Sequence, residues 1–500
     1  MMKQHRRQEI LTQRPQFKLL SEQEVHRIHS ESLHLLEEVG MKIQSHDALE
    51  LLKEAGASVN FNKEHAYFPS SLVEEQLKHA PSSIQLFDRE GHPAVLLEGD
   101  QVQFNPGSAA THILDHETGA RRHPTVKDVI DFAQVTEALP YIDAQSTALI
   151  PADVPPLLAD RYRLYLLLQH STKPIITGTF ALDAFNDMKQ MLEVIAGGPK
   201  KLRDKPRAIF DTCPSAPLQW SELTVHDLLF GASAGIPIEL ISMPQLGATG
   251  PITIAGSLVL HNAESLSGVV LAQLANKGAP VIYGGSPTAV DMQYGTARLG
   301  AIESMMLTCA YAQIAKHYNL PTHGYMGLSD AKIGADAQVG YEAATGFLLA
   351  AMSGINNIAG AGMLIFESTQ SYEKLVIDDM LAGMVKRFMT GVEVNDGTLA
   401  LDELREVGTK GGDFLRLRHT LAWFRKEHYM PGKLVDRQPF ESWQSQGALT
   451  SLDRARERVQ EILTTYDVPT LNNSQLQDLN AIAKTFMKRH KSSSLPHGPS

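Results

Sequence analysis

Between residues 102 and 366 the chain repeats one pattern eight times: a short apolar or β-branched run, an abrupt Gly, Pro or Ser loop, and a longer helix-like stretch. The runs span residues 102–113, 142–153, 174–180, 208–220, 237–253, 279–292, 321–332 and 356–366. Strands that alternate with helices of this length form parallel βαβ units. Eight units predict an α/β fold, a (β/α)8 TIM barrel, whose chemistry lies on the loops that follow the strands.

The regions on either side of these repeats predict a three-part organisation. Residues 1–98 are expected to form a helical region packed on the barrel, because Ser21 and Glu24 make a capping box ahead of apolar residues at helical spacing. Residues 99–470 form the barrel domain with a C-terminal extension that becomes more polar from about 391. Residues 471–500 are expected to form a helix and a disordered tail, since the sequence after His490 is too polar to bury itself.

Composition narrows the classes of partner. A net charge of -11 opposes binding to nucleic acid or to an anionic membrane surface. The two cysteines, Cys213 and Cys309, support neither a disulfide framework nor a thiolate metal site. The N-terminus lacks the apolar core of a signal peptide, so we expect a cytoplasmic protein. Residues 346–366 carry no charge over the length of a membrane span, but their Asn and Gly content favours a buried helix that leads into the eighth strand.

Three consecutive late loops concentrate ionisable and aromatic side chains and form the predicted substrate-binding site. Aromatic faces mixed with carboxylates suit a quaternary ammonium group, which has no N–H to donate. The predicted residues are Tyr283, Asp291, Tyr294 and Arg298 after the sixth strand, His323, Tyr325, Asp330, Lys332, Tyr341 and Glu342 after the seventh, and Phe366 and Glu367 after the eighth. The predicted cage walls are Tyr283, Tyr294, Tyr325 and Phe366, the charge partners Asp330, Glu342 or Glu367, and the clamps for a substrate carboxylate Lys332, His323 or Arg298. The alternative for the aromatic side chains is that they cap the core.

Other features allow different chemistry. Lys332 near the rim invites a Schiff-base hypothesis, because burial can free a lysine amine as a nucleophile. His112, His116 and His123 lie close together, but their spacing matches no standard zinc pattern and the intervening DHETG is typical of a hairpin tip, so no metal site is predicted. The glycines of residues 247–251 and 284–288 are only a weak phosphate-binding signal.

Three long segments carry a family resemblance: SDAKIGADAQVGYE (329–342), NNIAGAGMLIFESTQSYEKLVIDD (356–379) and GDFLRLRHTLAWFRKEHYMPGKLVDR (412–437). In this order they resemble the trimethylamine methyltransferase superfamily. Its members are barrel enzymes that move a methyl group from a methylamine to the cobalt of a corrinoid. The resemblance therefore implies a corrinoid (cobalamin) cofactor, carried by a cognate corrinoid protein or supplied free, and a docking surface that includes the glycine-rich loops after the fifth and sixth strands.

The substrate follows from one departure from the superfamily pattern. Founding members carry pyrrolysine in the SD-K motif, and Ile333 stands at that place here. Members without pyrrolysine act on quaternary amines, so the resemblance implies glycine betaine, with proline betaine, carnitine or trimethylamine as alternatives. Two hypotheses of another class remain: an aldolase or lyase that uses Lys332, and a non-catalytic betaine sensor. A homo-oligomer is also expected, because large barrels with exposed terminal helices often self-associate.

Overall fold

The computed structural model describes residues 14–334 and 336–498. Each of the eight predicted runs contains one parallel strand, which confirms the α/β class. These strands are β6 (Gln103–Phe104), β9 (Gln145–Ser146), β10 (Ile175–Thr177), β11 (Ala208–Thr212), β13 (Ile238–Ser242), β15 (Val281–Gly285), β18 (His323–Tyr325) and β19 (Asn357–Ala359).

The eight strands pair as two parallel sheets rather than as one continuous ladder. One sheet has the order β15-β13-β11-β10-β9 and the other has the order β18-β19-β6. Backbone hydrogen bonds join the sheets at both edges: the Tyr283 N–H donates to the Pro321 carbonyl at 2.9 Å, and the Asp143 N–H donates to the Phe104 carbonyl at 2.8 Å. The strands therefore follow one another in sequence order around a common interior.

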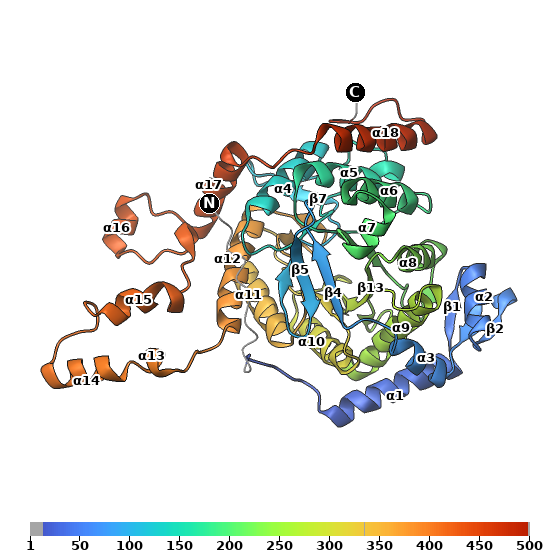
Figure 1. The fold of residues 1–500 in the computed structure, drawn as a ribbon, viewed down its shortest axis with the longest axis horizontal. Helices are drawn as coiled ribbons and strands as arrows, with labels where there is room; N and C mark the ends of the chain where they lie inside the picture. Colours follow the sequence, from blue (N-terminus) through green and yellow to red (C-terminus); the bar gives the residue numbers. More distant parts are fainter. Residues whose placement is uncertain (1–13, 335, 499–500) are drawn as a thin grey trace.

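Helices pack outside the strands (Figure 1). They are α4 (Val126–Ala138), α5 (Ala159–His170), α6 (Ala184–Ala196), α7 (Pro199–Asp204), α8 (Glu222–Ala234), α9 (Ile254–Ala275), α10 (Ile302–His317), α11 (Ala337–Met352) and α12 (Tyr372–Met389). Among the described residues, α9 is the single helix long and apolar enough to cross a membrane, yet 78% of its most apolar window is buried inside the protein. The uncharged segment 346–366 forms the end of α11, β19 and the loop after it, as a core element.

The N-terminal region begins as predicted and then departs from the prediction. Helix α1 (Glu22–Glu38) has the Ser21–Glu24 capping box. The region is not wholly helical. The sequence did not reveal its first three strands, because each has three residues and is too short to show an alternating pattern. It continues with β1 (Met41–Ile43), α2 (His46–Glu54), β2 (Ser58–Asn60), the 3-10 turn Phe61–Lys63, β3 (His65–Tyr67), α3 (Ser70–Leu77), β4 (Ser83–Phe87) and β5 (Pro93–Glu98).

The β4–β5 hairpin closes one end of the strands. Its residues Ile84, Leu86, Val95 and Leu97 form a buried apolar cluster with Ala144, Ile176, Ile209 and Ile282, which lie at or near the starts of four parallel strands. The opposite end, where the strands finish, carries the longer loops. These loops include β7 (His112–Leu114), β8 (Arg121–Arg122), the 3-10 turn Pro156–Leu158, β12 (Gln219–Trp220), β14 (Gln245–Leu246), β16 (Thr288–Val290), β17 (Ala297–Arg298), β20 (Met363–Leu364) and β21 (Thr369–Gln370).

Residues 391–449, called the arm below, leave the body after α12 and extend sideways (Figure 1). The arm contains α13 (Asp396–Leu399), α14 (Leu401–Lys410), α15 (Arg418–Glu427), the 3-10 turn Gly432–Leu434 and α16 (Phe440–Ser445). The chain then returns to the body through α17 (Ser451–Thr465), which packs on α12, and α18 (Asn473–Arg489), which packs on α6. The tail after His490 was predicted to be disordered, but Leu495 is buried and the Tyr162 hydroxyl donates to the Pro496 carbonyl.

Candidate active site

Two carboxyl groups, one half-buried and one fully buried, lie on neighbouring strands. Asp211 on β11 and Glu239 on β13 are paired in register. Burial raises the pKa of Asp211 to about 7, and burial together with the charge of Asp211 raises the pKa of Glu239 well above its ordinary value. Two like charges this close cannot both ionise cheaply. Both carboxyl groups therefore favour the protonated form more strongly than an exposed carboxyl group does, and the pair resists carrying two negative charges.

A relay of amides holds Glu239 in place. The Asn357 Nδ2 donates to Glu239 Oε1 at 2.9 Å, and the Asn105 Nδ2 donates to Asn357 Oδ1 at 2.8 Å. The Gly107 N–H in turn donates to Asn105 Oδ1 at 2.7 Å. Because each amide uses both its donor and its acceptor, the relay couples the acid pair to the loop after β6.

His323 and Tyr325 extend this group on β18. The His323 Nε2 lies 3.9 Å from Glu239 Oε2, and its ring packs edge to face on Tyr325 with centroids 5.0 Å apart. Burial lowers the pKa of His323 to about 3, so the imidazole is neutral. Gly284 leaves space for that ring, since a Cβ there would lie 2.7 Å from His323 Nδ1. The name interior cluster is used below for Asp211, Glu239, His323, Tyr325, Asn357 and Asn105.

A strained turn brings a further carboxyl group to the same end of the strands. Ile365, Phe366 and Glu367 have φ values of 51°, 59° and 62°, three successive non-glycine residues in the left-handed region. Each such residue costs about 1–3 kcal/mol and persists only where its surroundings enforce it, which is common at functional sites. The turn places Glu367 Oε1 where it accepts from the Ser286 hydroxyl at 2.7 Å, and burial raises the pKa of Glu367 to about 7.

Two buried polar atoms at this end have no partner among the described residues. They are His323 Nδ1 and Asp330 Oδ1. Buried polar atoms are nearly always hydrogen-bonded, so such exceptions mark a place for water or a ligand. The buried cation nearby, Arg163, donates to the carbonyls of Thr147 and Ala159 at 2.7 and 3.2 Å. The site thus offers carboxyl oxygens and aromatic faces, which suit a cation.

Five of the predicted substrate-binding residues lie at this site: His323, Tyr325, Asp330, Phe366 and Glu367. Asp330 Oδ2 accepts from the Gly300 N–H at 2.9 Å, and burial raises the pKa of Asp330 to about 6. The Phe366 ring lies beneath Lys332, whose Nζ is 3.8 Å from the ring centroid. Their roles in binding substrate stay predictions.

Other predicted residues lie elsewhere. Tyr283 is on the outer face of β15, where its hydroxyl donates to Asn262 Oδ1 of α9 at 2.9 Å, so it packs in the helix layer. Asp291 accepts the N–H groups of Gln293 and Tyr294 in the turn between β16 and β17, while Tyr294 is 73% exposed. The remaining positions are Arg298, exposed on β17, Tyr341, exposed on α11, and Glu342, whose carboxylate accepts from Ser329 and the Asp330 N–H.

Lys332 and Ile333 follow β18 on the surface. The Lys332 Nζ donates to the Asp330 carbonyl at 2.7 Å, and its side chain is exposed. The Schiff-base hypothesis required a buried amine, so this position removes its premise. Ile333 is 57% exposed. The histidines considered for metal binding are also separated: His116 pairs with Glu373 at 2.7 Å, whereas His112 and His123 stack on each other.

The sequence analysis missed Asp211, Glu239, Asn105 and Asn357. A signal was present, because the runs AIFDT and PIELIS each place one carboxyl residue inside an otherwise apolar strand. Such a residue must face either the interior or a strand end. These residues lie within the strands, whereas the predicted site residues were all sought on the loops.

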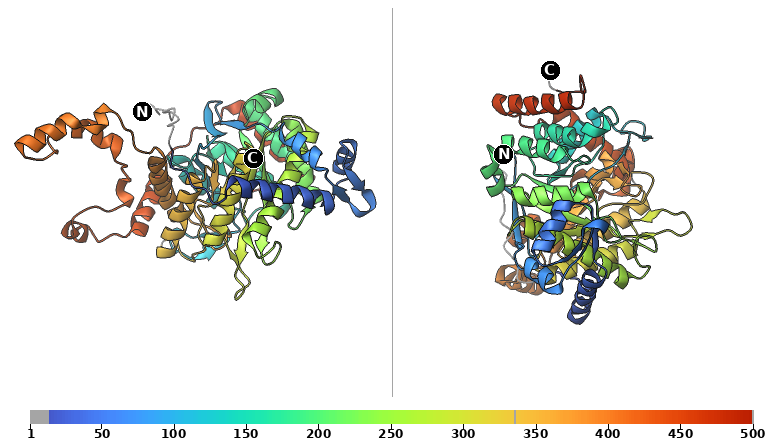
Figure 2. Two further views of the ribbon diagram at one scale, coloured as in Figure 1. Left: turned by 90° about the horizontal axis from the view of Figure 1, so that it is seen from below. Right: turned by 90° about the vertical axis from the view of Figure 1, so that its right-hand side faces the viewer.

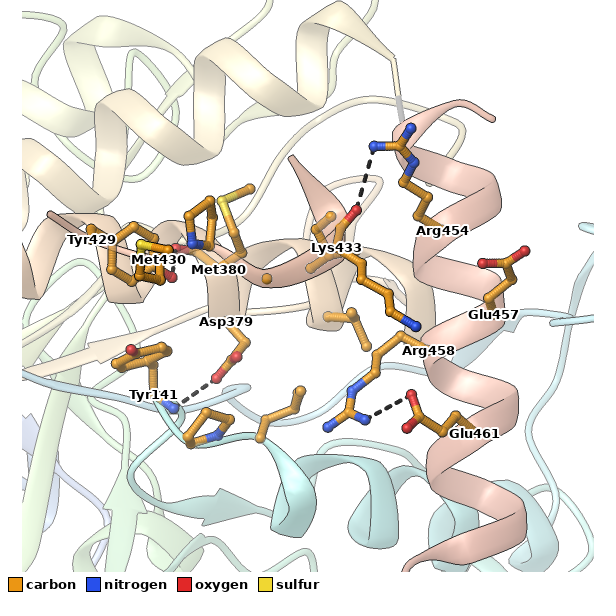
Figure 3. A pocket seen from close by; sticks show the side chains of 16 residues that line it. Tyr141, Asp379, Met380, Tyr429, Met430, Lys433, Arg454, Glu457, Arg458 and Glu461 are labelled. Carbon is orange, nitrogen blue, oxygen red and sulfur yellow. Dashed lines mark hydrogen bonds and ion pairs between the residues drawn. The ribbon is translucent and has the colours of Figure 1, made fainter. Parts of the chain in front are cut away.

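A separate cavity of 460 Å³ lies on the flank of the body, between α12, α17 and residues 429–434 (Figure 3). Tyr141, Asp379 and Tyr429 line one side, and Arg458, paired with Glu461 at 2.9 Å, lines the other. Because this cavity is at the root of the arm and outside the parallel strands, it does not share the interior cluster. We therefore assign the candidate active site to the C-terminal ends of the strands.

Comparison with known proteins gives consistent results. The model of the trimethylamine methyltransferase family matches residues 1–494. The chain is 37% identical to a trimethylamine methyltransferase of Desulfitobacterium hafniense, covering 93% of both chains, and 32% identical to a glycine betaine methyltransferase of the same species, covering 92% of this chain and 95% of that one. The crystal structure of the Methanosarcina barkeri monomethylamine methyltransferase aligns over 88% of this chain and 94% of that chain, with 12% identity and a TM-score of 0.47. The chain belongs to the trimethylamine methyltransferase family and is a methyltransferase of methylated amines.

Proposed function

We propose that this protein transfers a methyl group from a quaternary amine, most simply glycine betaine, to the cobalt of a corrinoid carried by a partner protein. The observation that carries the proposal is the acid pair Asp211–Glu239 on neighbouring strands, with unpartnered buried polar atoms of His323 and Asp330 at the same end of the strands. In this proposal the two parallel sheets act as one (β/α)8 barrel, with the substrate at the C-terminal ends of its strands.

The choice of a quaternary amine rests on Ile333. The relatives include enzymes named for trimethylamine and for glycine betaine at similar identity, so identity alone does not select a substrate. Pyrrolysine supplies the family's trimethylamine enzymes with an electrophile, and isoleucine has none. A quaternary nitrogen needs no such group: its C–N bond breaks with the electron pair left on nitrogen, and the leaving group is a neutral tertiary amine.

Electrostatics set the strength with which such a substrate is held. The positive charge on nitrogen disappears as the methyl group departs, so very tight binding of the cation before reaction would oppose catalysis. A single charge shared by Asp211 and Glu239, together with the faces of Tyr325 and Phe366, gives moderate attraction. Lys332 at the rim is the proposed partner for a substrate carboxylate, because it is exposed directly above Phe366.

The rim suits a large flat partner group. Exposed apolar side chains lie on the loops after β13, β15 and β18, namely Ile252, Met292, Tyr294 and Ile333, and Tyr341 is exposed on α11. The β16–β17 hairpin projects from the body at this end (yellow-green in Figure 2). When bound there, the corrinoid would supply the nucleophilic cobalt that accepts the methyl group, and the chain's own residues would orient the amine and exclude water. A reduced cobalt fits a cytoplasmic location.

An assay of methyl transfer tests the proposal. The purified protein is mixed with reduced cobalamin or its corrinoid protein and with one of five donors: glycine betaine, proline betaine, carnitine, butyrobetaine or trimethylamine. We expect methylated cobalt and a tertiary amine product with glycine betaine and none with trimethylamine. Reaction with a different betaine would correct the substrate only. Reaction with trimethylamine alone, or with no donor while the cobalt remains active, would contradict the proposal.

Matched variants make the assay specific for the site. Asp211→Asn removes the carboxyl group of the pair, whereas Asp204→Asn makes the same change at the exposed last residue of α7, before β11 begins. Only the first should lose activity. A protein that binds betaine and yields no tertiary amine with any corrinoid would instead be the sensor.

A further inference from the structure

The arm exposes many large apolar side chains, whereas the body buries most of them. Val392, Leu415 and Leu421 are 85%, 81% and 85% exposed. None of the four arm helices buries a residue. Further large apolar side chains that are at least two-fifths exposed are Val394, Leu399, Leu401, Leu404, Phe414, Phe424, Met430 and Phe440. Monomeric proteins rarely expose apolar surface on this scale without a binding partner.

The arm helices are too short to be stable alone. Helices α14 and α15 have ten residues each, and isolated helices shorter than about 12–15 residues are marginal in water. Helices in proteins gain most of their stability from packing an apolar face. The body contacts the arm near its return, through the Arg387–Glu427 ion pair at 3.0 Å and the Tyr429 hydroxyl, which donates to the Met380 carbonyl at 3.0 Å. Helices α14 and α15 nevertheless bury no residue, so they need a further surface to pack against.

The apolar surface continues from the arm onto the body. Met384 and Phe388 of α12 are 46% and 48% exposed. Together with Val392 and Pro431 they line a cavity of 540 Å³ beside the root of the arm. A partner that covers the arm can therefore also fill this cavity, which gives one continuous interface.

Charge on the arm is divided into two segments of opposite sign. Glu393, Asp396 and Glu403 lie in or before α14, and Arg416, Arg418 and Lys426 lie in or before α15. None of these six side chains makes an ion pair with another described residue. Two identical arms related by a two-fold axis would place the acidic segment of each against the basic segment of the other, as a self-complementary interface requires.

The position of the arm also favours a second copy of this chain over a protein that docks at the active site. Figure 2 shows the arm leaving the body sideways, while the β16–β17 hairpin projects in another direction, from the end where the strands finish. A protein seated over that end would leave the arm of the same chain uncovered. The arm is also longer than the roughly 20–30 residues that a standard interface uses on each side.

We propose that the arms of two copies of this chain pack against each other, acidic segment to basic segment, and against the exposed flank of α12, to form a two-fold symmetric dimer. This proposal is independent of the substrate and of the methyl-transfer reaction.

Light scattering coupled to size-exclusion chromatography measures the mass of the full-length protein. The wild type should be a dimer or a multiple of one at micromolar concentration. Leu415→Glu combined with Leu421→Glu should raise the dissociation constant at least 100-fold, with an unchanged circular dichroism spectrum of the barrel. Leu157→Glu is the matched control, since Leu157 is 60% exposed outside the arm. A monomeric wild type, or a double variant that stays dimeric, would overturn the proposal.

Reversing the charges of the acidic or the basic segment of the arm tests whether the arm binds a second copy of this chain. One variant carries Glu393→Lys and Glu403→Lys, and a second carries Arg416→Glu and Arg418→Glu. Each alone should be mostly monomeric, because like charges then face each other, and an equimolar mixture should form a heterodimer. A mixture that stays monomeric, or a wild-type arm covered only when the corrinoid protein is added, would show that the arm does not pair with itself.

Discussion

The interior cluster and the arm depart from usual protein structure in opposite ways: the cluster buries carboxyl groups, and the arm exposes apolar side chains. The interior places Asp211, which is half-buried, and Glu239, which is fully buried, among apolar strands, where a carboxylate is costly. The arm exposes Leu421 and Val392, where water makes hydrocarbon costly. Each departure indicates the chemistry of what is missing: a cation in the interior and an apolar surface with complementary charge on the arm.

The body between these regions follows the ordinary rules. Trp220 is fully buried, and its indole N–H donates to Ser267 Oγ at 2.9 Å. Arg122 forms a two-pronged ion pair with Asp128 at 2.7 and 2.8 Å. Stability therefore resides in the layers around the strands. The two exceptional regions should respond to substitution independently of each other.

The largest expected effect is on kcat/KM, and it should differ between substitutions of Asp211 and of Glu239. Asp211→Asn should lower kcat/KM for the quaternary amine ~100-fold, the scale of losing one well-placed electrostatic group. Glu239→Gln should cost less, because the pKa of Glu239 is raised well above its ordinary value, which favours its neutral form, and glutamine keeps a neutral donor there. Steady-state kinetics check both, and the mass by light scattering should stay that of the wild type. Equal losses would show that the charge is not on Asp211.

The pH dependence of activity and stability should run in opposite directions. The raised pKa values of Asp211 and Glu367, both about 7, mean that kcat/KM for a cation falls as the pH drops below about 7. Folding responds with the other sign: the folded state binds these protons more tightly than the unfolded state, so their contribution to stability is complete below about pH 4 and is lost as the pH rises to about 7.

Comparison with Asp211→Asn isolates this contribution. The melting temperature of the variant relative to wild type should increase between pH 5 and pH 8, because only the wild type must bury a charge at the higher pH. A constant difference would contradict the raised pKa. Arm variants should leave this pH dependence unchanged.

Two tyrosines on neighbouring strands offer an intermediate test. Tyr325→Phe removes the hydroxyl that donates to the Ser108 carbonyl at 2.9 Å, which should loosen the loop after β6 and lower kcat/KM about tenfold. Tyr283→Phe removes a buried hydrogen bond to Asn262 and should cost about 1 kcal/mol of unfolding free energy with kcat/KM unchanged. Denaturant unfolding and kinetics on both variants check this, and the reverse pattern would place Tyr283 at the substrate.

The smallest effect is expected at Ile333. This side chain is exposed and carries no reactive group, so Ile333→Ala should change the unfolding free energy by less than about 0.5 kcal/mol. Activity with a quaternary amine should stay within about threefold of wild type. A complete loss of activity would mean that the residue at this position still takes part in the reaction.

Periodicity in the sequence was enough to locate all eight parallel strands and the start of α1, because both depend on local patterns. The site was predicted only in part. Tyr283 and Tyr325 look alike in sequence, but their positions on β15 and β18 direct one outward and the other inward, and strand register decides this. Asp211 and Glu239 became a pair only through that register. Exposure of the arm depends on tertiary packing, which no local pattern contains.

Binding of glycine betaine, compared with its isostere 3,3-dimethylbutanoate, in which a neutral carbon replaces the cationic nitrogen, tests the central claim most directly and needs no corrinoid. Titration calorimetry at pH 8 on the wild type and on Asp211→Asn would measure both ligands. The account predicts that the wild type binds betaine at least tenfold more tightly than the isostere, and that Asp211→Asn loses this preference. Equal affinities in the wild type, or a preference that survives in the variant, would contradict a cation site at the acid pair.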